Sequence, residues 1–82
     1  MEKEALARRF GSSVRRLRSV KGYSQERFAE ACQIERSYMG MIERGEVNVT
    51  LAMVVKVARG LGISLVDLFL EFQRDWGDPG ST

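Results

Sequence analysis

The side chains of this sequence that could do chemistry are mostly basic, while nucleophiles and metal ligands are scarce. The 82 residues include 13 lysines and arginines, no histidine and a single cysteine, Cys32. Histidine acid–base catalysis, Cys/His metal sites, redox cysteine pairs and disulfides within the chain are therefore excluded. The carboxylates are scattered, and Cys32 is predicted to be buried. We accordingly predict a protein that is not an enzyme and that uses neither a metal nor a cofactor.

The basic residues are concentrated near the N-terminus. Positions 8–21 contain six of them and no acid: Arg8, Arg9, Arg15, Arg16, Arg18 and Lys21. Residues 67–82 instead carry four acids against Arg74, so the formal net charge of +2 divides into −3 for this end and +5 for residues 1–66. A basic segment beside an acidic end is typical of a protein that contacts a polyanion with one face. A basic face that is merely solvated is the alternative.

No segment is long and apolar enough to predict a membrane span. The longest uninterrupted apolar run, Leu51–Val55, ends at Lys56 and is far shorter than the ~18 residues that a span requires. Residues 2–4 are charged and no apolar stretch follows them, so a signal peptide is not expected. The lone cysteine fits a reducing cytosol. We expect a cytoplasmic protein with no membrane partner.

Short helices must position the basic side chains, because turn signals divide the chain and no segment alternates like an exposed strand. Helices are predicted over residues 3–20, 25–32, 36–44, 51 to 59 or 60, and 65–76. Three residues are suited to cap helix starts, namely Ser24, Thr50 and Ser64. Three are suited to end helices, namely Gly22, Gly45 and Gly62. The prediction is an all-α domain over residues 1–76, with its core at about 10–70 and a disordered tail at 77–82.

The helical spacing of apolar residues predicts the buried faces. The first helix presents one stripe, made of Leu6, Phe10, Val14, Leu17 and Val20. The next three helices contribute Phe28, Ala29 and Cys32, then Met39 and Ile42, then Leu51, Val54, Val55 and Ala58. From the fifth helix, Leu68 and Phe69 are expected to join this core together with Ile63.

Two short helices joined by a three-residue turn make residues 24–44 the most informative segment. In a helix-turn-helix, the second helix enters the DNA major groove and presents its first residues to base edges. The stretches G-x-S-Q at 22–25, I-E-R-G at 42–45 and L-G-I-S at 61–64, in this order, resemble the Cro/C1-type (XRE family) helix-turn-helix transcriptional regulators. The resemblance covers about residues 10–69 and implies a five-helix, lambda-repressor-like fold. Residues 35–38 and 42–44 resemble the controller proteins of restriction-modification systems somewhat more than phage-type repressors.

This resemblance also implies roles for individual side chains. Base contacts are expected from Arg36, Ser37, Gly40 and Met41, and DNA backbone contacts from Gln25, Tyr38, Arg44 and Asn48. Arg18 and Glu43 stand where similar proteins hold a structural ion pair between the first and third helices.

Each expected contact has a chemical reason, and several have an alternative. Arg36 could bond guanine O6 and N7 together, and Met41 could contact a thymine methyl group. Gln25 would bond a phosphate at a helix N-terminus, and Gly40 would let the helix backbone approach DNA closely. The alternatives are that Arg36 and Gln25 are simply exposed, that Met41 packs at a protein contact, and that Tyr38 is half-buried.

Four residues depart from the usual pattern of the family. Gln33 occupies a turn position where glycine is common, so a left-handed backbone there would cost roughly 1 kcal/mol. Glu35 places an acid at the start of the recognition helix, and Glu46 with Val47 replaces the basic residues that often follow it. These departures predict modest DNA affinity for one copy of the chain.

The fifth helix carries more apolar residues than one core face requires. Five of them are expected on the surface, where an isologous contact between two copies would cover them: Leu65, Val66, Leu70, Phe72 and Trp76. Such a homodimer would place two recognition helices about 34 Å apart, one turn of DNA. In the alternative arrangement Phe72 and Trp76 fold back over the first helix near Leu6.

The sequence therefore predicts a DNA-binding transcriptional regulator, such as a repressor, that binds a pseudo-palindromic operator in double-stranded DNA as a homodimer. The recognition helix would be residues 36–44. The alternative is a protein-interaction module, such as an antitoxin or antirepressor, that binds another protein through the apolar fifth helix.

Overall fold

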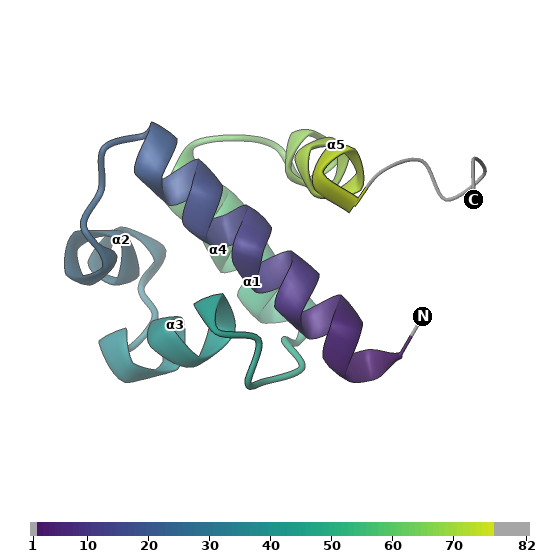
Figure 1. Ribbon diagram of the computed structural model, residues 1–82. Coiled ribbons are helices and arrows are strands. Elements are labelled where there is room, and N and C mark those ends of the chain that lie inside the picture. The colour runs from purple at the N-terminus through teal and green to yellow at the C-terminus, as the bar shows by residue number, and fades with distance from the viewer. Residues whose placement is uncertain (1, 77–82) are drawn as a thin grey trace.

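A computed structural model of the chain describes residues 2–76. In that range it has five helices joined by short turns and no strand. The helices are α1 (Lys3–Val20), α2 (Gln25–Cys32), α3 (Arg36–Glu43), α4 (Leu51–Leu61) and α5 (Leu65–Trp76). The long α1 runs across the molecule, with α2 and α3 at one side and α5 at the other (Figure 1). The predicted all-α, five-helix fold is confirmed. The predicted disordered tail, residues 77–82, and the side chain of Trp76 lie outside the described residues.

Helix starts follow from local hydrogen bonding. At three of them the residue before the helix accepts a hydrogen bond from the third helical backbone N–H: Ser24 from Arg27 at 3.2 Å, Thr50 from Met53 at 3.2 Å and Ser64 from Asp67 at 3.0 Å. These bonds satisfy backbone donors that have no partner within the helix. The three predicted N-caps are therefore confirmed.

Helix ends depend on residues that accept a left-handed backbone. Gly22, Gly45 and Gly62 have φ angles of 80°, 73° and 71°. The missing side chain lets each residue adopt this conformation without steric cost. The predicted glycine stops are therefore confirmed, and α4 runs slightly beyond its predicted end, to Leu61.

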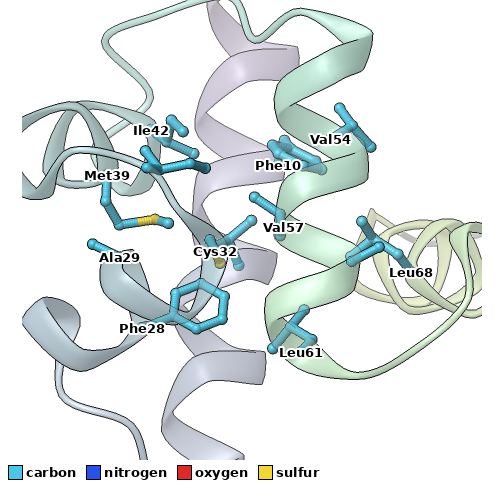
Figure 2. Packing of buried hydrophobic residues seen from close by; sticks show 13 residues of the cluster. Phe10, Phe28, Ala29, Cys32, Met39, Ile42, Val54, Val57, Leu61 and Leu68 are labelled. Atoms are coloured by element: carbon cyan, nitrogen blue, oxygen red, sulfur yellow. The ribbon is translucent and has the colours of Figure 1, made fainter.

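The core is built from all five helices, and Figure 2 shows its side chains converging between α1, α4 and the two short helices. Its buried members are Phe10, Val14, Phe28, Ala29, Cys32, Ile34, Met39, Ile42, Val54, Val57, Ala58, Leu61 and Leu68. Most were predicted from the apolar spacing. The prediction was wrong for Leu51, which is exposed in the first turn of α4, whereas Val57 and Leu61 are buried instead. The stripe on α1 is also shorter than predicted, since Leu6 and Val20 are exposed.

Two glycines inside helices let neighbouring elements approach closely. A Cβ atom on Gly11 of α1 would lie 2.8 Å from the backbone oxygen of Glu43, at the end of α3, and would overlap that of Ile42. A Cβ atom on Gly60 of α4 would overlap the sulfur of Cys32 in α2. Because real Cβ atoms do not approach other atoms so closely, these glycines set the α1–α3 and α2–α4 spacings.

Helix α5 is attached to the rest of the domain by one core residue, one ring contact and one ionic cluster. Leu68 is fully buried, and the Phe72 ring meets Phe10 edge to face, with centroids 5.7 Å apart. Arg16 donates to Glu71 at 2.7 Å and to Asp75 at 2.9 Å. These hydrogen bonds raise the pKa of the Arg16 guanidinium.

Three expectations for α5 need correction. Phe69, predicted to be in the core together with Leu68, is exposed, whereas Leu68 is buried as predicted and points toward α4 (Figure 2). Phe72, predicted to be stranded on the surface, packs against α1, as the alternative arrangement required. Leu65 is also partly buried against the core.

Candidate nucleic-acid interface

A left-handed residue joins α2 to α3. Gln33 has φ of 57° and ψ of 43°, and its N–H donates to the Glu30 carbonyl at 3.0 Å. The next N–H, that of Ile34, donates to the Ala29 carbonyl at 2.9 Å, and the Ile34 side chain is buried. The turn therefore keeps the backbone that glycine would favour, and Gln33 bears the steric cost of its side chain.

A buried carboxylate holds the two short helices against α1. The Glu43 side chain is only 3% exposed and forms an ion pair with Arg18, Nε to Oε2 at 2.8 Å. A second guanidinium nitrogen donates to the other oxygen at 3.1 Å, and a third donates to the Tyr23 carbonyl at 2.9 Å. The Gln25 amide of α2 also donates to Glu43, at 3.1 Å. The predicted Arg18–Glu43 ion pair is confirmed, and it links α1, α2 and α3.

Gln25 is consequently not the freely exposed side chain that was one alternative. It is the first residue of α2, is half-buried, and uses its amide nitrogen to bond Glu43. The amide group has two N–H donors, so this bond occupies one of them. The expected phosphate contact of Gln25 stays a prediction.

The first turn of α3 borders an open hollow of about 540 Å³. Its lining consists of Gln25, Glu35, Arg36, Ser37, Gly40 and Arg44. Five of these six residues were predicted to contact DNA. The fold brings them together from the start of α2, from α3 and from the residue that follows α3. Arg36, Ser37 and Arg44 are exposed there. We call this surface the α3 hollow.

The other predicted contact residues lie around the α3 hollow rather than in its lining. Met41 is exposed on α3. Tyr38 is half-buried and packs against the core, which agrees with the alternative for this residue. Asn48 is exposed in the loop after α3, where it borders a separate small hollow of about 170 Å³ with residues of α1 and its own loop.

Gly40 forms the floor of the α3 hollow. It is buried, and a Cβ atom there would lie 3.0 Å from an Arg44 guanidinium nitrogen and 3.6 Å from the Gln25 amide oxygen. Two side chains therefore lie close to the place where a Gly40 side chain would stand. Glycine gives those side chains room, and a direct contact of Gly40 with a base stays a prediction.

Two acidic residues engage candidate DNA-binding side chains within the chain itself. Ser37 donates a hydrogen bond from its hydroxyl to the Glu35 carboxylate. Arg44 donates to Glu46 through Nε at 2.9 Å and through Nη2 at 3.0 Å. Both acids depart from the family pattern in the sequence, but their contacts with Ser37 and Arg44 were not predicted. The signal available in the sequence was the two-residue separation within each pair.

The basic segment of α1 does not form one continuous cationic face. Arg18 is engaged with Glu43, and Arg16 is engaged with two acids of α5. Arg8, Arg9, Arg15 and Lys21 remain exposed. Fewer basic side chains of this segment are therefore available for the predicted contact with a polyanion than the sequence suggested.

The sulfur of Cys32 lies inside the core. Burial, together with the negative charge of Glu43, raises the pKa of this thiol to about 12. A thiol that stays protonated is a poor nucleophile. The predicted burial of Cys32 is confirmed.

Neither a membrane segment nor a metal cluster is found over the described range. None of the helices between residues 2 and 76 combines the length and apolar character needed to cross a bilayer. Within the same range, no three histidine, cysteine, aspartate or glutamate side chains are grouped so that they could hold a metal ion.

Comparison with known proteins agrees with this geometry. A family model described as helix-turn-helix matches residues 14–68. The chain is 40% identical over 68 residues to the control protein C.MunI of Mycoplasma sp., covering 82% of this chain and 92% of that protein. It is 42% identical over 60 residues to the control protein C.BamHI of Bacillus amyloliquefaciens, covering 72% of this chain and 74% of that protein.

A solved structure also has the same architecture. The crystal structure of the restriction-modification controller protein C.AhdI from Aeromonas hydrophila superimposes with a TM-score of 0.72 at 43% identity, covering 79% of this chain and 97% of that one. These relatives are regulators and not enzymes, in agreement with the prediction from the missing nucleophiles and bases. The chain belongs to the XRE-type helix-turn-helix family of DNA-binding transcriptional regulators.

Proposed function

We propose that this protein binds a pseudo-palindromic operator as a homodimer and inserts α3 of each copy into the major groove. The observation that carries the proposal is the α3 hollow, where Arg36 and Ser37 are exposed beside Arg44. The helix that presents them is held by the buried Glu43, so their placement does not depend on DNA. A surface that is arranged before binding loses little conformational entropy on binding.

In this proposal the residues around the α3 hollow have two kinds of contact. Base edges are contacted by Arg36, Ser37, Gly40 and Met41, and the DNA backbone by Gln25, Tyr38, Arg44 and Asn48. Arg36 is the main source of sequence preference, because its guanidinium matches both acceptors of guanine. The backbone contacts fix the orientation of α3 in the groove.

The dimer part of the proposal is supported by an apolar surface on α5. Val66, Phe69 and Leu70 are exposed at helical spacings of three and four residues. At the end of α1, Val20 is 74% exposed and borders a hollow of about 400 Å³ together with Leu70. Contiguous exposed apolar residues favour contact with another protein surface. A second copy is the proposed occupant, with the half-buried Leu65 and Phe72 at the edge of the contact.

We further propose that the chain acts as the control protein of a restriction-modification system, the role named for its relatives. The competing possibility is an antitoxin or antirepressor that uses the α5 surface to bind a different protein. The same exposed residues favour that possibility, so the two are separated by experiment.

The most direct experiment is selection of bound DNA from a random pool, combined with sedimentation of the protein alone. We expect a consensus of two inverted half-sites about one helical turn apart and a dimer in solution. Arg36→Ala should weaken discrimination at one position per half-site by about 1–3 kcal/mol. No enrichment of any sequence by the wild-type protein would exclude sequence-specific DNA binding. A single half-site bound by a monomer would exclude the homodimer.

A further inference from the structure

The end of α3 contains an ion pair in which a residue of the α3 hollow is already bound to an anion. Arg44 and Glu46 form two parallel hydrogen bonds, at 2.9 Å and 3.0 Å, between guanidinium and carboxylate. Arg44 lines the α3 hollow, whereas Glu46 does not. The pair therefore connects the DNA-facing surface to the loop that follows α3.

The backbone keeps Glu46 next to Arg44. Gly45 turns the chain with its left-handed φ of 73°, and the Glu46 N–H donates to the Met41 carbonyl at 2.9 Å. A Cβ atom on Gly45 would lie 2.6 Å from the Cα atom of Arg8, so this turn is packed against α1. The carboxylate is thus carried on a turn that is anchored both to α3 and to α1.

A carboxylate and a phosphate compete for the same face of an arginine. Both anions accept two parallel hydrogen bonds from one edge of the guanidinium, and Glu46 already occupies the edge formed by Nε and Nη2. The hydrogen bonds raise the pKa of Arg44 and lower the pKa of Glu46, so both groups are charged near neutral pH. A phosphate that binds through this edge of Arg44 must therefore displace Glu46.

We propose that Glu46 competes with a DNA phosphate for Arg44 and thereby limits the affinity of the protein for DNA. The inference rests on the proposed function, in which Arg44 contacts the DNA backbone. The Arg44 side chain is 58% exposed and the Glu46 side chain is 50% exposed. An ion pair this exposed to water contributes little free energy. The corresponding loss of DNA affinity is about 1.5- to 5-fold per half-site. Two half-sites multiply this effect.

The test compares DNA binding by the wild-type protein, Glu46→Gln, Arg44→Gln and the double variant, with the selected DNA fragment at several salt concentrations. Glu46→Gln should bind about 2- to 25-fold more tightly over two half-sites. For Glu46→Gln, the logarithm of the binding constant should fall more steeply with the logarithm of the salt concentration, by up to about 0.9 in slope per half-site. The reason is that Arg44 then contributes its whole charge to a phosphate. In the Arg44→Gln background, Glu46→Gln should change affinity little.

A matched control separates this competition from a general change of charge. Glu30→Gln removes one exposed acid of α2 that lies outside the α3 hollow, so it changes the net charge equally. The inference is overturned if Glu46→Gln binds no more tightly than Glu30→Gln, or if its gain is the same without Arg44.

An NMR titration of the Glu46 carboxyl tests the pair without DNA. Its pKa should lie below that of an ordinary glutamate in the wild-type protein and return to the ordinary range in Arg44→Gln. An ordinary pKa in the wild-type protein would overturn the inference. If the wild-type protein binds no selected DNA, the proposed function fails, and the titration still decides whether the pair exists.

Discussion

The guanidinium of Arg18 binds both oxygens of Glu43, at 2.8 Å and 3.1 Å, across the contact between α1 and α3. Gln25 adds a third donor to the same carboxylate. Glu43 is thus a buried charge whose hydrogen-bonding capacity is largely used, which is the condition under which such a charge is tolerated. Together with the buried Met39 and Ile42, this side chain holds α3 in position relative to the other helices.

Removing Arg18 should destabilise the domain. Arg18→Ala leaves the Glu43 carboxylate buried with Gln25 as its remaining partner, so we expect the free energy of unfolding to fall by about 3 kcal/mol. Urea denaturation followed by circular dichroism measures this change. Arg15→Ala, which removes an exposed arginine from the same helix, should change stability by less than about 0.5 kcal/mol. Equal effects of the two substitutions would show that the ion pair does not stabilise the fold.

Replacing Gly11 by alanine should lower the stability of the domain, although alanine is normally the better helix former. Alanine normally favours a helix over glycine by about 1 kcal/mol. Here the added Cβ atom would meet the backbone oxygens of Ile42 and Glu43, so we expect Gly11→Ala to lower stability by about 1–3 kcal/mol. Thermal denaturation gives the change. Ser12→Ala, at the adjacent exposed position, serves as the control and should not destabilise. A stabilised Gly11→Ala variant would contradict the close approach of α1 to α3.

Replacing Gln33 by glycine should stabilise the turn between α2 and α3. The left-handed backbone at Gln33, with φ of 57°, costs a non-glycine residue roughly 1 kcal/mol. Gln33→Gly should recover part of this cost, whereas Gln33→Val should lower stability further because a β-branched side chain tolerates this conformation poorly. Denaturant midpoints for the two variants and the wild type should therefore rank glycine, glutamine, valine. The reverse ranking would mean that the turn does not keep this backbone.

Stability should fall at alkaline pH because of Cys32. Burial raises the folded-state pKa of this thiol from 9.0 to about 12, whereas the thiol of the unfolded chain ionises at its ordinary pKa. Above pH 9 the unfolded state loses a proton that the folded state retains, so the free energy of unfolding decreases until the folded thiol also ionises. The decrease between pH 9 and 12 should be smaller in Cys32→Ala than in the wild type. Parallel pH profiles would exclude this contribution.

Two charges on the exposed face of α5 should separate the proposed dimer. Val66→Glu combined with Leu70→Glu places acids at positions that are 66% and 58% exposed, so the monomer fold should be retained. We expect monomers by sedimentation and weaker operator binding, with unchanged circular dichroism. Phe72 is unsuitable for this purpose, because its ring packs on Phe10. A dimer that persists in the double variant would place the contact elsewhere.

Local sequence signals predicted most of the fold. Ser24, Thr50 and Ser64 cap helices through atoms only three residues away, and Gly22 ends a helix through its own backbone. Such interactions depend on neighbouring residues in the chain, so spacing reveals them.

What could not be predicted depends on tertiary contacts. Nothing near Gly11 in the sequence indicates the carbonyl groups at the end of α3, and nothing near Leu51 shows that the first turn of α4 extends beyond the core. For the candidate site, the set of residues was predicted by resemblance, but their partners were not. Whether Arg44 faces solvent or Glu46 depends on how Gly45 turns the chain, and this is a matter of backbone geometry.

The attachment of α3 through Glu43 has an evolutionary consequence. A helix of eight residues is too short to be stable alone, so its course is set by contacts with other helices, among them those of Glu43 with Arg18 and Gln25. The exposed residues Arg36, Ser37 and Met41 take no part in that attachment. Substitutions at these three positions can therefore accumulate without loss of the fold. Under the proposed function, descendants of one ancestral domain can acquire new operators while the supporting framework stays the same.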